Sequence, residues 1–436
     1  MKLIRKYLLL IFLGLGLFFV LLRVDNLQNK IVKATVNNYQ EKQINLDVKS
    51  AIAIDAKNGQ VFYAKNANKK LPVASMSKLI TIYLTLEAIK NKKISWEQEV
   101  NPTEQIVKVS KNTEFSGVPL ELGHKYTIRQ LYEATLIDSA NGPAMLLAET
   151  IGGSQLDFVN QMQDQVKEWG IKNAKIYTPS GLPNYTLGKE MYPGVSKNAE
   201  NELSAEDMAI IVTKLITDFP EVINTTKIAH EDFNDQGKIT SMQNWNWMLK
   251  GLSQYDANYP LDGLKTGTTD AAGACFAGTM VKNGRRIITI VMGAQHKDGN
   301  DPSRFTQTKK LLNYVFSRYQ LYILKKNSTI SGAKHIDIIN GEKTTAKIVL
   351  QKNTGIWLSK ETQLKGKVEP SSILAPQQAG TKVGTIDIVS VPSIKDDNGV
   401  QLPATVKTNV KETNFFIKLW NSFVELKQLV NSYLNK

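Results

Sequence analysis

Two hairpin signals that lie far apart in the sequence constrain the fold of this chain most strongly. The first surrounds Asn58-Gly59 and the second surrounds Asn283-Gly284, each with short apolar runs on both sides. Both dipeptides suit the tight turn that joins two antiparallel strands. Between them, apolar residues recur at helical spacing in 79–89, 128–136 and 145–151. The sequence therefore predicts an α+β domain, in which early and late strands form one antiparallel sheet with an inserted helical lobe.

The sequence changes character after about Leu321. β-branched and apolar residues there are separated by Gly, Pro, Asn and Lys, as in 336–339, 346–350 and 383–389. This pattern predicts short strands in a small all-β domain. Helical periodicity returns over the last residues of the chain. The predicted segments are 1–34, 35–320, 321–410 and 411–436.

The first residues have the pattern of an export signal. Three cations, at positions 2, 5 and 6, precede an apolar run from Tyr7 to Leu22, which Arg23 closes. The run has 16 residues, fewer than the roughly 20 of a spanning helix. A signal peptide cleaved after Ala34 and a retained N-terminal anchor are therefore both open. In either case the positive flank places the rest of the chain outside the cytoplasm.

The chain is basic, with a formal net charge of +14 and a pI near 9.4. The basic residues are dispersed and no nucleic-acid-binding module is legible, so we expect no nucleic-acid partner. Attraction to an anionic membrane surface or to wall polymers is the expected consequence. Cys275 is the single cysteine, which excludes an intramolecular disulfide. It lies in an apolar run and should be buried.

Ser75 and Lys78 form the first candidate catalytic pair. They lie where the first long helix should begin, three residues apart, so both side chains fall on one face. A serine hydroxyl becomes a good nucleophile only when a base takes its proton, and a lysine can be that base only if its pKa is lowered. The helix dipole and desolvation both act in that direction. Ser331 and Lys334 share the spacing, but they lie in a polar stretch, and no motif further along the sequence completes a catalytic site with them.

Two further elements could complete a site. Ser139-Ala-Asn141 lies at the junction of two predicted helices, where a loop can present side chains. Lys265-Thr266-Gly267 immediately precedes the second hairpin and should lie on an edge strand, where it can hold a substrate carboxylate beside a peptide backbone. Residues 110–112 and 196–198 repeat the Ser-x-Asn pattern in polar stretches typical of turns or helix caps. The three elements converge only if lobe and sheet face each other across a cleft.

With these motifs in this order, the chain resembles the low-molecular-mass penicillin-binding proteins that are serine-type D-alanyl-D-alanine carboxypeptidases (peptidase family S11). The resemblance extends from Ala51 to the C-terminus. Family-like stretches are 55–59, 74–78, 136–141, 178–183, 204–208 and 262–273. The resemblance implies a β-lactamase/transpeptidase-like domain, an antiparallel sheet with a helical lobe, followed by a small all-β domain and a C-terminal amphipathic helix.

The resemblance also implies a role for each site residue. Ser75 would be the acylated nucleophile, Lys78 its general base and Ser139 a proton relay. The substrate-binding residues would be Asn141, Lys265, Thr266, Gly267 and Thr268. Lys265 and Thr266 would hold the terminal carboxylate, and the backbone amides of Ser75 and Thr268 would form the oxyanion hole. No metal or cofactor is expected.

The implied reaction is removal of the terminal D-alanine from peptidoglycan pentapeptides. Stem peptides ending in D-Ala-D-Ala and β-lactam antibiotics are the expected partners. A transpeptidase using the same acyl-enzyme and a catalytically silent wall-binding protein are the alternatives.

A class A β-lactamase would need a Glu-x-x-Leu-Asn segment, a zinc enzyme a His-Glu-x-x-His motif, and an α/β-hydrolase a Gly-x-Ser-x-Gly elbow, and the sequence has none of these. Gly142 and Thr268 depart from residues common in the family, which affects substrate preference and deacylation more than the reaction class.

The C-terminal tail has an apolar stripe with an aromatic bias. Its members are Phe416, Leu419, Trp420, Phe423, Leu426, Val430 and Tyr433. Polar residues interrupt the segment too often for it to span a bilayer, so it should lie in the plane of the interface. A helix packed on the β domain and a dimerising helix are the alternatives. With the resemblance, attachment to the outer face of the cytoplasmic membrane is the expectation.

Overall fold

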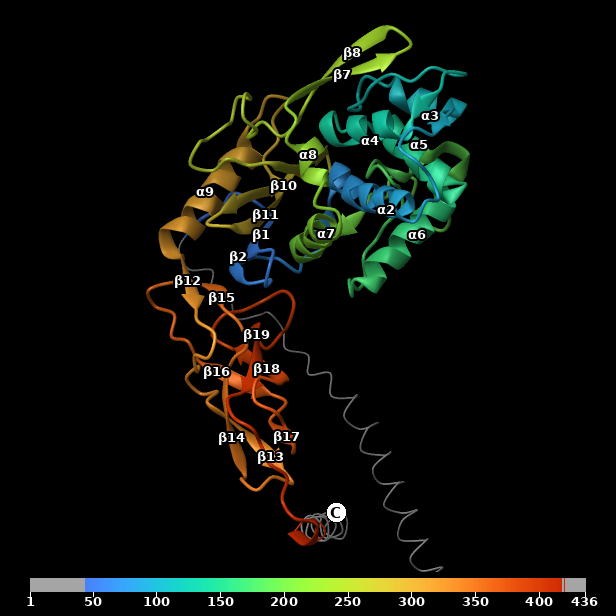
Figure 1. Cartoon of the computed structure of the whole chain (residues 1–436). Coiled ribbons are helices and arrows are strands. Elements are labelled where there is room, and N and C mark those ends of the chain that lie inside the picture. The colour runs from blue at the N-terminus through green and yellow to red at the C-terminus, as the bar shows by residue number, and fades with distance from the viewer. Residues whose placement is uncertain (1–43, 418, 420–436) are drawn as a thin grey trace, which may run out of the picture. The chain divides into compact units, whose positions relative to one another are not determined.

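An antiparallel sheet built from distant parts of the sequence organises the first part of the chain (Figure 1). The computed structural model describes residues 44–417 and 419. The strands of the sheet are β1 (Ser50–Asp55), β2 (Val61–Lys65), β9 (Gly263–Thr269), β10 (Gly273–Lys282) and β11 (Arg285–Ala294). Their spatial order is β2-β1-β11-β10-β9. The early strand β1 pairs with the late strand β11, with Ala51 opposite Val291, which confirms the predicted closure of the sheet.

Both predicted hairpins are confirmed. Gly59 has φ 72°, and Asn283 and Gly284 have φ 53° and 70°. These left-handed angles are the ones that Asn and Gly adopt most readily, and they match the twist of the flanking strands. In the first turn, Asn58 Oδ1 also accepts a hydrogen bond from Gln60 N at 3.1 Å.

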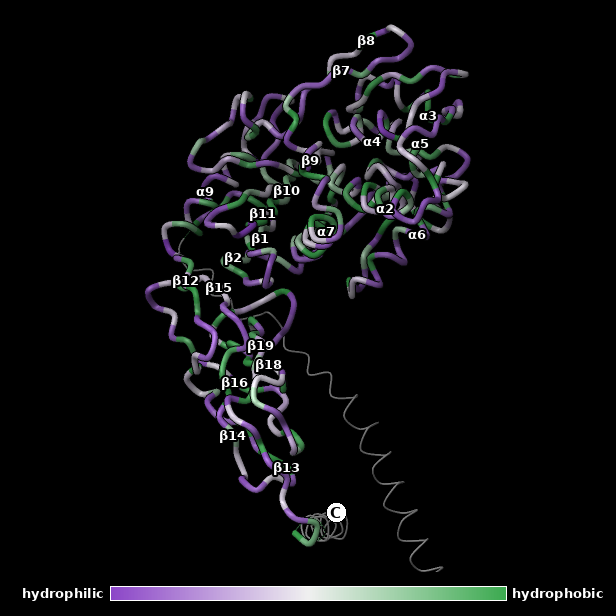
Figure 2. Tube along the Cα trace, in the orientation of Figure 1, coloured by the Kyte–Doolittle hydropathy of each residue, from purple (hydrophilic) through white to green (hydrophobic). Residues whose placement is uncertain are grey.

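The predicted helical lobe lies between β2 and β9 in the sequence. Its main helices are η1 (Ala74–Ser77), α2 (Lys78–Lys90), α3 (Glu104–Ser110), α4 (Ile128–Ile137), α5 (Asn141–Gly152) and α6 (Gln155–Glu168). Helix α2 is buried on nearly all sides, as expected of a helix that is apolar all round, and Figure 2 shows its hydrophobic colouring. Thr127 forms a capping box with Gln130 and so fixes the start of α4.

Two helices cover the opposite faces of the sheet. They are α7 (Ala205–Asp218) and α9 (Ser303–Arg318). Ile52 on β1 belongs to the same buried cluster as Ile211 of α7, whereas its neighbour Ala51 belongs to the cluster of Leu311 on α9. Successive residues of a strand point to opposite faces, so the sheet is a central layer with a core on each side.

The C-terminal part of the described chain is rich in β-structure. Its strands are β12 (Gln320–Leu324), β13 (His335–Ile339), β14 (Thr345–Leu350), β15 (Thr354–Leu358), β16 (Gly366–Glu369), β17 (Ser372–Leu374), β18 (Lys382–Ile388) and β19 (Val400–Val406). Six of them form a sheet in the order β16-β18-β19-β14-β13-β17, and β12 pairs with β15. Buried residues of different strands, such as Ile348, Ile386 and Leu402, form a separate hydrophobic cluster.

Short elements complete the described chain. They are β3 (Leu71–Pro72), β4 (Glu99–Val100), β5 (Tyr126–Thr127), η2 (Asn184–Glu190), β6 (Glu202–Leu203), α8 (Val222–Thr226), β7 (His230–Asp235) and β8 (Lys238–Gln243). The predicted export segment 1–34 and most of the predicted tail helix lie outside the described residues. None of the helices described combines the length and the apolar character needed to traverse a bilayer.

Asp55 joins the central sheet to β15. Its side chain is fully buried, and Oδ2 accepts hydrogen bonds from Arg285 Nε at 2.7 Å and from Trp357 Nε1 at 2.8 Å. Gln60 adds two hydrogen bonds to the backbone of Trp357, at 2.6 and 3.0 Å. A carboxylate at the end of β1 therefore neutralises a buried guanidinium and orients an indole from the C-terminal region.

Replacing this carboxylate should destabilise the fold strongly. Asp55→Asn leaves Arg285 buried without its counter-charge, so the free energy of unfolding should fall by about 3–5 kcal/mol in a urea titration. Asp47→Asn, which removes an exposed carboxylate, serves as the matched control and should change stability by less than about 0.5 kcal/mol. Equal effects of the two substitutions would contradict the role assigned to Asp55.

Candidate active site

Ser75 and Lys78 lie next to each other at the start of the buried helix α2. Ser75 belongs to the 3-10 turn η1, and Lys78 is the first residue of α2. Lys78 Nζ lies 2.7 Å from Ser75 Oγ, 2.8 Å from Asn141 Oδ1 and 3.0 Å from the Ser180 carbonyl oxygen. The last two atoms can only accept hydrogen bonds, whereas the hydroxyl can also donate. A neutral amine fits this set, because it donates to the two acceptors and accepts the Ser75 proton.

Burial favours that neutral amine. The Lys78 side chain is fully buried, and burial, reinforced by the nearby charge of Lys265, holds the pKa of its amine well below the usual range, although Asp138 opposes the shift. Burial likewise lowers the pKa of Lys265 to about 7 and raises the pKa of Asp138 to about 6. The site thus contains a candidate base whose pKa is lowered well below that of an ordinary lysine.

The predicted element 139–141 lies beside this pair. Ser139 follows α4 with φ 59°, an uncommon backbone angle for a residue with a side chain, and it lines the cleft. Asn141 begins α5, and its two polar atoms are occupied: Oδ1 accepts from Lys78, and Nδ2 donates to the Ser116 carbonyl oxygen at 2.8 Å. Asn141 therefore holds Lys78 in place from behind the cleft wall.

The predicted Lys-Thr-Gly element lies on β9, the edge strand that faces η1. Thr266, Gly267 and Thr268 line a cleft of about 310 Å³ together with Ser75. Lys265 is buried behind that wall, and its Nζ donates to the Thr266 carbonyl oxygen at 3.2 Å. The structure thus brings all the predicted residues to one place, although Lys78, Asn141 and Lys265 form an inner layer and the others form the surface.

Gly267 allows the strand β9 to approach Ser75 closely. A Cβ atom there would lie 2.6 Å from the Val73 carbonyl oxygen and 3.2 Å from Ser75 N. Gly181 has the same function on the other side, since its Cβ would lie 1.9 Å from the Ala74 carbonyl oxygen. The segment containing Gly181 also supplies the Ser180 carbonyl to Lys78, a contact that the motif analysis missed because a backbone acceptor leaves no side-chain signature.

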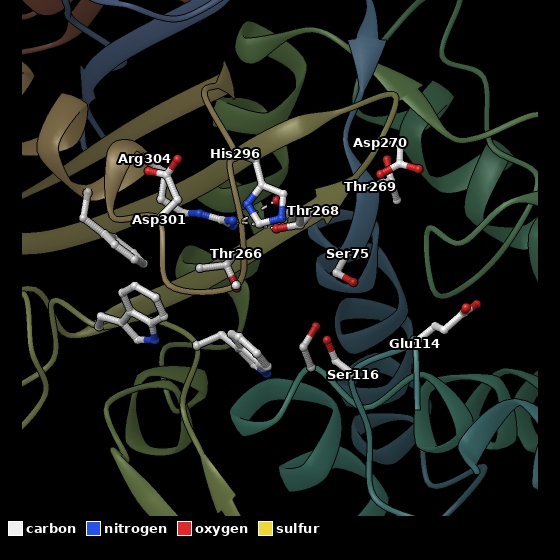
Figure 3. Close-up of a pocket in the computed structure, with 16 residues that line it drawn as sticks. Ser75, Glu114, Ser116, Thr266, Thr268, Thr269, Asp270, His296, Asp301 and Arg304 are labelled. Atoms are coloured by element: carbon white, nitrogen blue, oxygen red, sulfur yellow. Dashed lines mark hydrogen bonds between the residues drawn. The ribbon is translucent and has the colours of Figure 1, made fainter. Parts of the chain in front are cut away.

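Arg304 is a second residue that the sequence analysis missed. It lies in the first turn of α9, and its Nη1 donates to the carbonyl oxygens of Gly267 and Cys275, while Nη2 donates to Thr268 Oγ1 at 2.6 Å. Figure 3 shows Arg304 and Thr268 across the cleft from Ser75. Its only signal in the sequence is a cation at the start of an amphipathic helix, which is also common on protein surfaces.

Aromatic and acidic residues also line the cleft. Trp245 and Trp247 line one part, and the carboxylates of Glu114, Asp270 and Asp301 line others. None of these was predicted. Among the described residues, no group of three His, Cys, Asp or Glu side chains could hold a metal ion.

The structure also accounts for Gly142 and for two serines, Ser110 and Ser331, whose sequence motifs resemble those of the candidate site. A Cβ at Gly142 would lie 2.6 Å from Ser110 Cβ, so a larger side chain at position 142 has no room here. Ser110 Oγ donates to Val107 O and accepts from Leu120 N, a structural role. Ser331 lies in a turn before β13 and not on a helix. Cys275 is buried, as predicted.

Comparisons with known proteins agree with this geometry. A family model described as D-alanyl-D-alanine carboxypeptidase matches residues 36–296. D-alanyl-D-alanine carboxypeptidase DacF of Bacillus subtilis (strain 168) is 28% identical over 377 residues, which cover 85% of this chain and 87% of the relative. The crystal structure of a peptidoglycan synthesis regulatory factor (PBP3) from Streptococcus pneumoniae is 34% identical with a TM-score of 0.69, and the match covers 84% of this chain and all of that one. The crystal structure of penicillin-binding protein D2 from Listeria monocytogenes, in its ampicillin-bound form, is 30% identical with a TM-score of 0.51. That match covers 63% of this chain and 99% of the other.

Fold and site together define a serine-type hydrolase with the architecture of the low-molecular-mass penicillin-binding proteins. The chain belongs to the D-alanyl-D-alanine carboxypeptidase family. The fold class and the family resemblance predicted from the sequence are thereby confirmed.

The close approach at Gly267 can be tested directly. Gly267→Ala should push β9 away from η1, and a displacement of about 1 Å can cost about 100-fold in rate. The measurement is the rate of Ser75 acylation by an acyl thioester, followed by intact mass. Gly278→Ala is the control, because its Cβ would crowd Phe276, Leu261 and Thr289 side chains instead and should lower the melting temperature more than the rate. Equal acylation rates in Gly267→Ala and the unaltered protein would disprove the role of Gly267.

Proposed function

We propose that this protein removes the terminal D-alanine from peptidoglycan pentapeptides through an acyl-enzyme on Ser75. The observation that carries the proposal is the 2.7 Å contact between the Lys78 amine and the Ser75 hydroxyl, inside a set of acceptors that suits a neutral amine. The name that the family model and the Bacillus subtilis relative share supports the same substrate.

The chemical steps follow from this geometry. Lys78 takes the Ser75 proton as Oγ attacks the carbonyl carbon of the penultimate D-alanine. Backbone N–H groups of Ser75 and Thr268 stabilise the tetrahedral oxyanion. The C–N bond then breaks, and the leaving D-alanine amine receives the proton from Lys78 through Ser139. The Lys78 amine then deprotonates a water molecule, which hydrolyses the acyl ester, and the proton returns to Ser75.

The terminal carboxylate of the substrate would bind at the β9 side of the cleft. Thr266 and Thr268 line this side, and Arg304 places a guanidinium next to Thr268 Oγ1. In its protonated form, Lys265 would act from behind the wall through its positive charge, because its side chain is buried. Gly267 would let the peptide backbone run along β9. A contact between Asn141 and a substrate amide would require its Nδ2 to leave the Ser116 carbonyl.

Penicillin should acylate the same serine, because its strained lactam amide resembles the acyl-D-alanyl-D-alanine bond. The ampicillin-bound relative from Listeria monocytogenes supports this inference. A transpeptidase would use the same acyl-enzyme and differ only in whether an amine or water attacks it. A silent wall-binding protein is disfavoured because the candidate catalytic residues are all present.

Product analysis tests the proposed reaction. The protein incubated with a muramyl pentapeptide should release D-alanine and leave a tetrapeptide, even when an acceptor amine is present. Ser75→Ala should reduce turnover by at least about 1,000-fold, because the nucleophile is removed.

Ser331→Ala is the matched control for this experiment. It removes the serine of the second Ser-x-x-Lys sequence and should leave the rate unchanged. A cross-linked product would indicate a transpeptidase, and unchanged turnover in Ser75→Ala would refute the assignment of the nucleophile.

We further propose that the protein is exported and attached to the outer face of the cytoplasmic membrane by the segment 411–436. The described start of this segment supports the proposal, since Phe415, Phe416, Ile417 and Leu419 expose 46 to 79% of their surface. Asn414 Oδ1 accepts a hydrogen bond from Ile417 N, which is typical of a helix start. Segments 35–320 and 321–410 would be the catalytic domain and the β domain that separates it from the membrane.

Membrane attachment can be measured by flotation with vesicles that contain anionic lipid. Two chains that begin at Thr35, with and without residues 412–436, remove any contribution of the N-terminal run. Only the chain with the tail should float with the vesicles, because the apolar stripe and the cations Lys418, Lys427 and Lys436 bind the interface together. Both chains should bind penicillin equally. Identical flotation of the two would contradict attachment through the tail.

A further inference from the structure

A second pocket lies away from the active site, where the β1–β2 turn meets the C-terminal β-rich region. It has a volume of about 400 Å³. Its lining comes from four segments: the β1–β2 turn, the start of β11, the β14–β15 turn and the segment 393–403. The cations that line it are Lys57, Arg285, Lys352 and Lys395.

Two side-chain donors of residues that line this pocket are buried and have no partner among the described residues. Arg285 is 6% exposed. Its Nε donates to Asp55 and its Nη1 donates to the Gly355 carbonyl oxygen at 3.2 Å, but its Nη2 has no partner among the described residues. Asn58 Nδ2 is likewise buried and unpaired within the described part of the chain. An unsatisfied buried donor costs about 1–3 kcal/mol, so both atoms need an acceptor.

The surrounding charges define the kind of acceptor. Lys57 and Lys352 are exposed, and no described carboxylate lies within ion-pair distance of either. Lys395 Nζ donates to the carbonyl oxygens of Ala56 and Lys57 and keeps its third donor. The single carboxylate of the lining, Asp396, already accepts hydrogen bonds from its own loop. Cations therefore outnumber carboxylates four to one in the lining, and its unused groups include several hydrogen-bond donors.

We infer that this pocket binds a phosphate group, held by Arg285 Nη2 and Asn58 Nδ2 and surrounded by Lys57, Lys352 and Lys395. A phosphate offers acceptor oxygens in several directions, which suits donors that converge from four chain segments. A guanidinium next to lysines is a common arrangement for this anion. A single carboxylate would use fewer of these donors and would leave more of the positive charge uncompensated.

The inferred site is independent of the proposed reaction, because none of its residues lines the catalytic cleft. A bound phosphate would contact both the turn that follows Asp55 and the β14–β15 turn that precedes Trp357. It would therefore add to the contacts that Asp55 and Gln60 make with Trp357. The phosphate could belong to a free monoester or to the phosphodiester of an anionic polymer, and the two share the chemistry that the pocket recognises.

Calorimetric titration of the purified full-length protein in detergent tests this inference. The probes are inorganic phosphate, sn-glycerol 3-phosphate and bis(glycerol) phosphate, with acetate as the carboxylate. At least one phosphate probe should bind saturably with one site per chain and more tightly than acetate. Strong binding of the diester would point to a polymer, and binding of inorganic phosphate and sn-glycerol 3-phosphate alone would point to a free phosphate.

Charge-matched variants separate the pocket from the general positive charge of the chain. Lys57→Gln/Lys352→Gln should weaken phosphate binding by at least about tenfold, because two cations next to the anion are lost. Lys172→Gln/Lys347→Gln removes the same charge from exposed positions elsewhere and should change the affinity by less than about twofold. Both variants should retain full penicillin binding, which verifies their folding. No saturable binding, equal binding of acetate, or equal weakening in the two variants would overturn the inference.

Discussion

The burial of one amine among three oxygen atoms is the constraint on which the active site depends. A charged lysine without a counter-ion is costly inside a protein, and Lys78 is fully buried. The neutral form is tolerated because Asn141 and Ser180 accept its two N–H groups and Ser75 occupies its lone pair. The interaction that makes the interior position possible is thus also the one that would activate Ser75 in the proposed reaction.

The fold supplies these three partners from segments that are remote in the sequence. Ser75 comes from the turn before α2, Asn141 from the start of α5 and the Ser180 carbonyl from a loop. Gly181 and Gly267 let that loop and the edge strand β9 approach η1 more closely than any side chain would permit. The two glycines therefore position the backbone segments that surround Ser75.

Much of this arrangement could be predicted from the sequence, for definite physical reasons. The Asn-Gly turns have few alternative conformations, so they located both hairpins, and the order of the three motifs implied a lobe facing a sheet. Arg304 and the Ser180 carbonyl could not be predicted from the sequence, because each acts through a tertiary contact and not through spacing along the chain. Lys265 and Asn141 were predicted as site residues, but their burial behind the cleft wall depends on packing that no local pattern encodes.

The pH dependence of Ser75 acylation by penicillin tests the neutral amine most directly. Burial lowers the pKa of Lys78, so the amine loses its proton well below pH 10.5. The second-order rate constant should therefore be small at low pH, rise through that lowered pKa and reach its plateau well below the usual lysine pKa. A rate constant that rises only as the pH approaches the usual lysine pKa of about 10.4 would show that Lys78 is charged in the free enzyme and would contradict its role as the base.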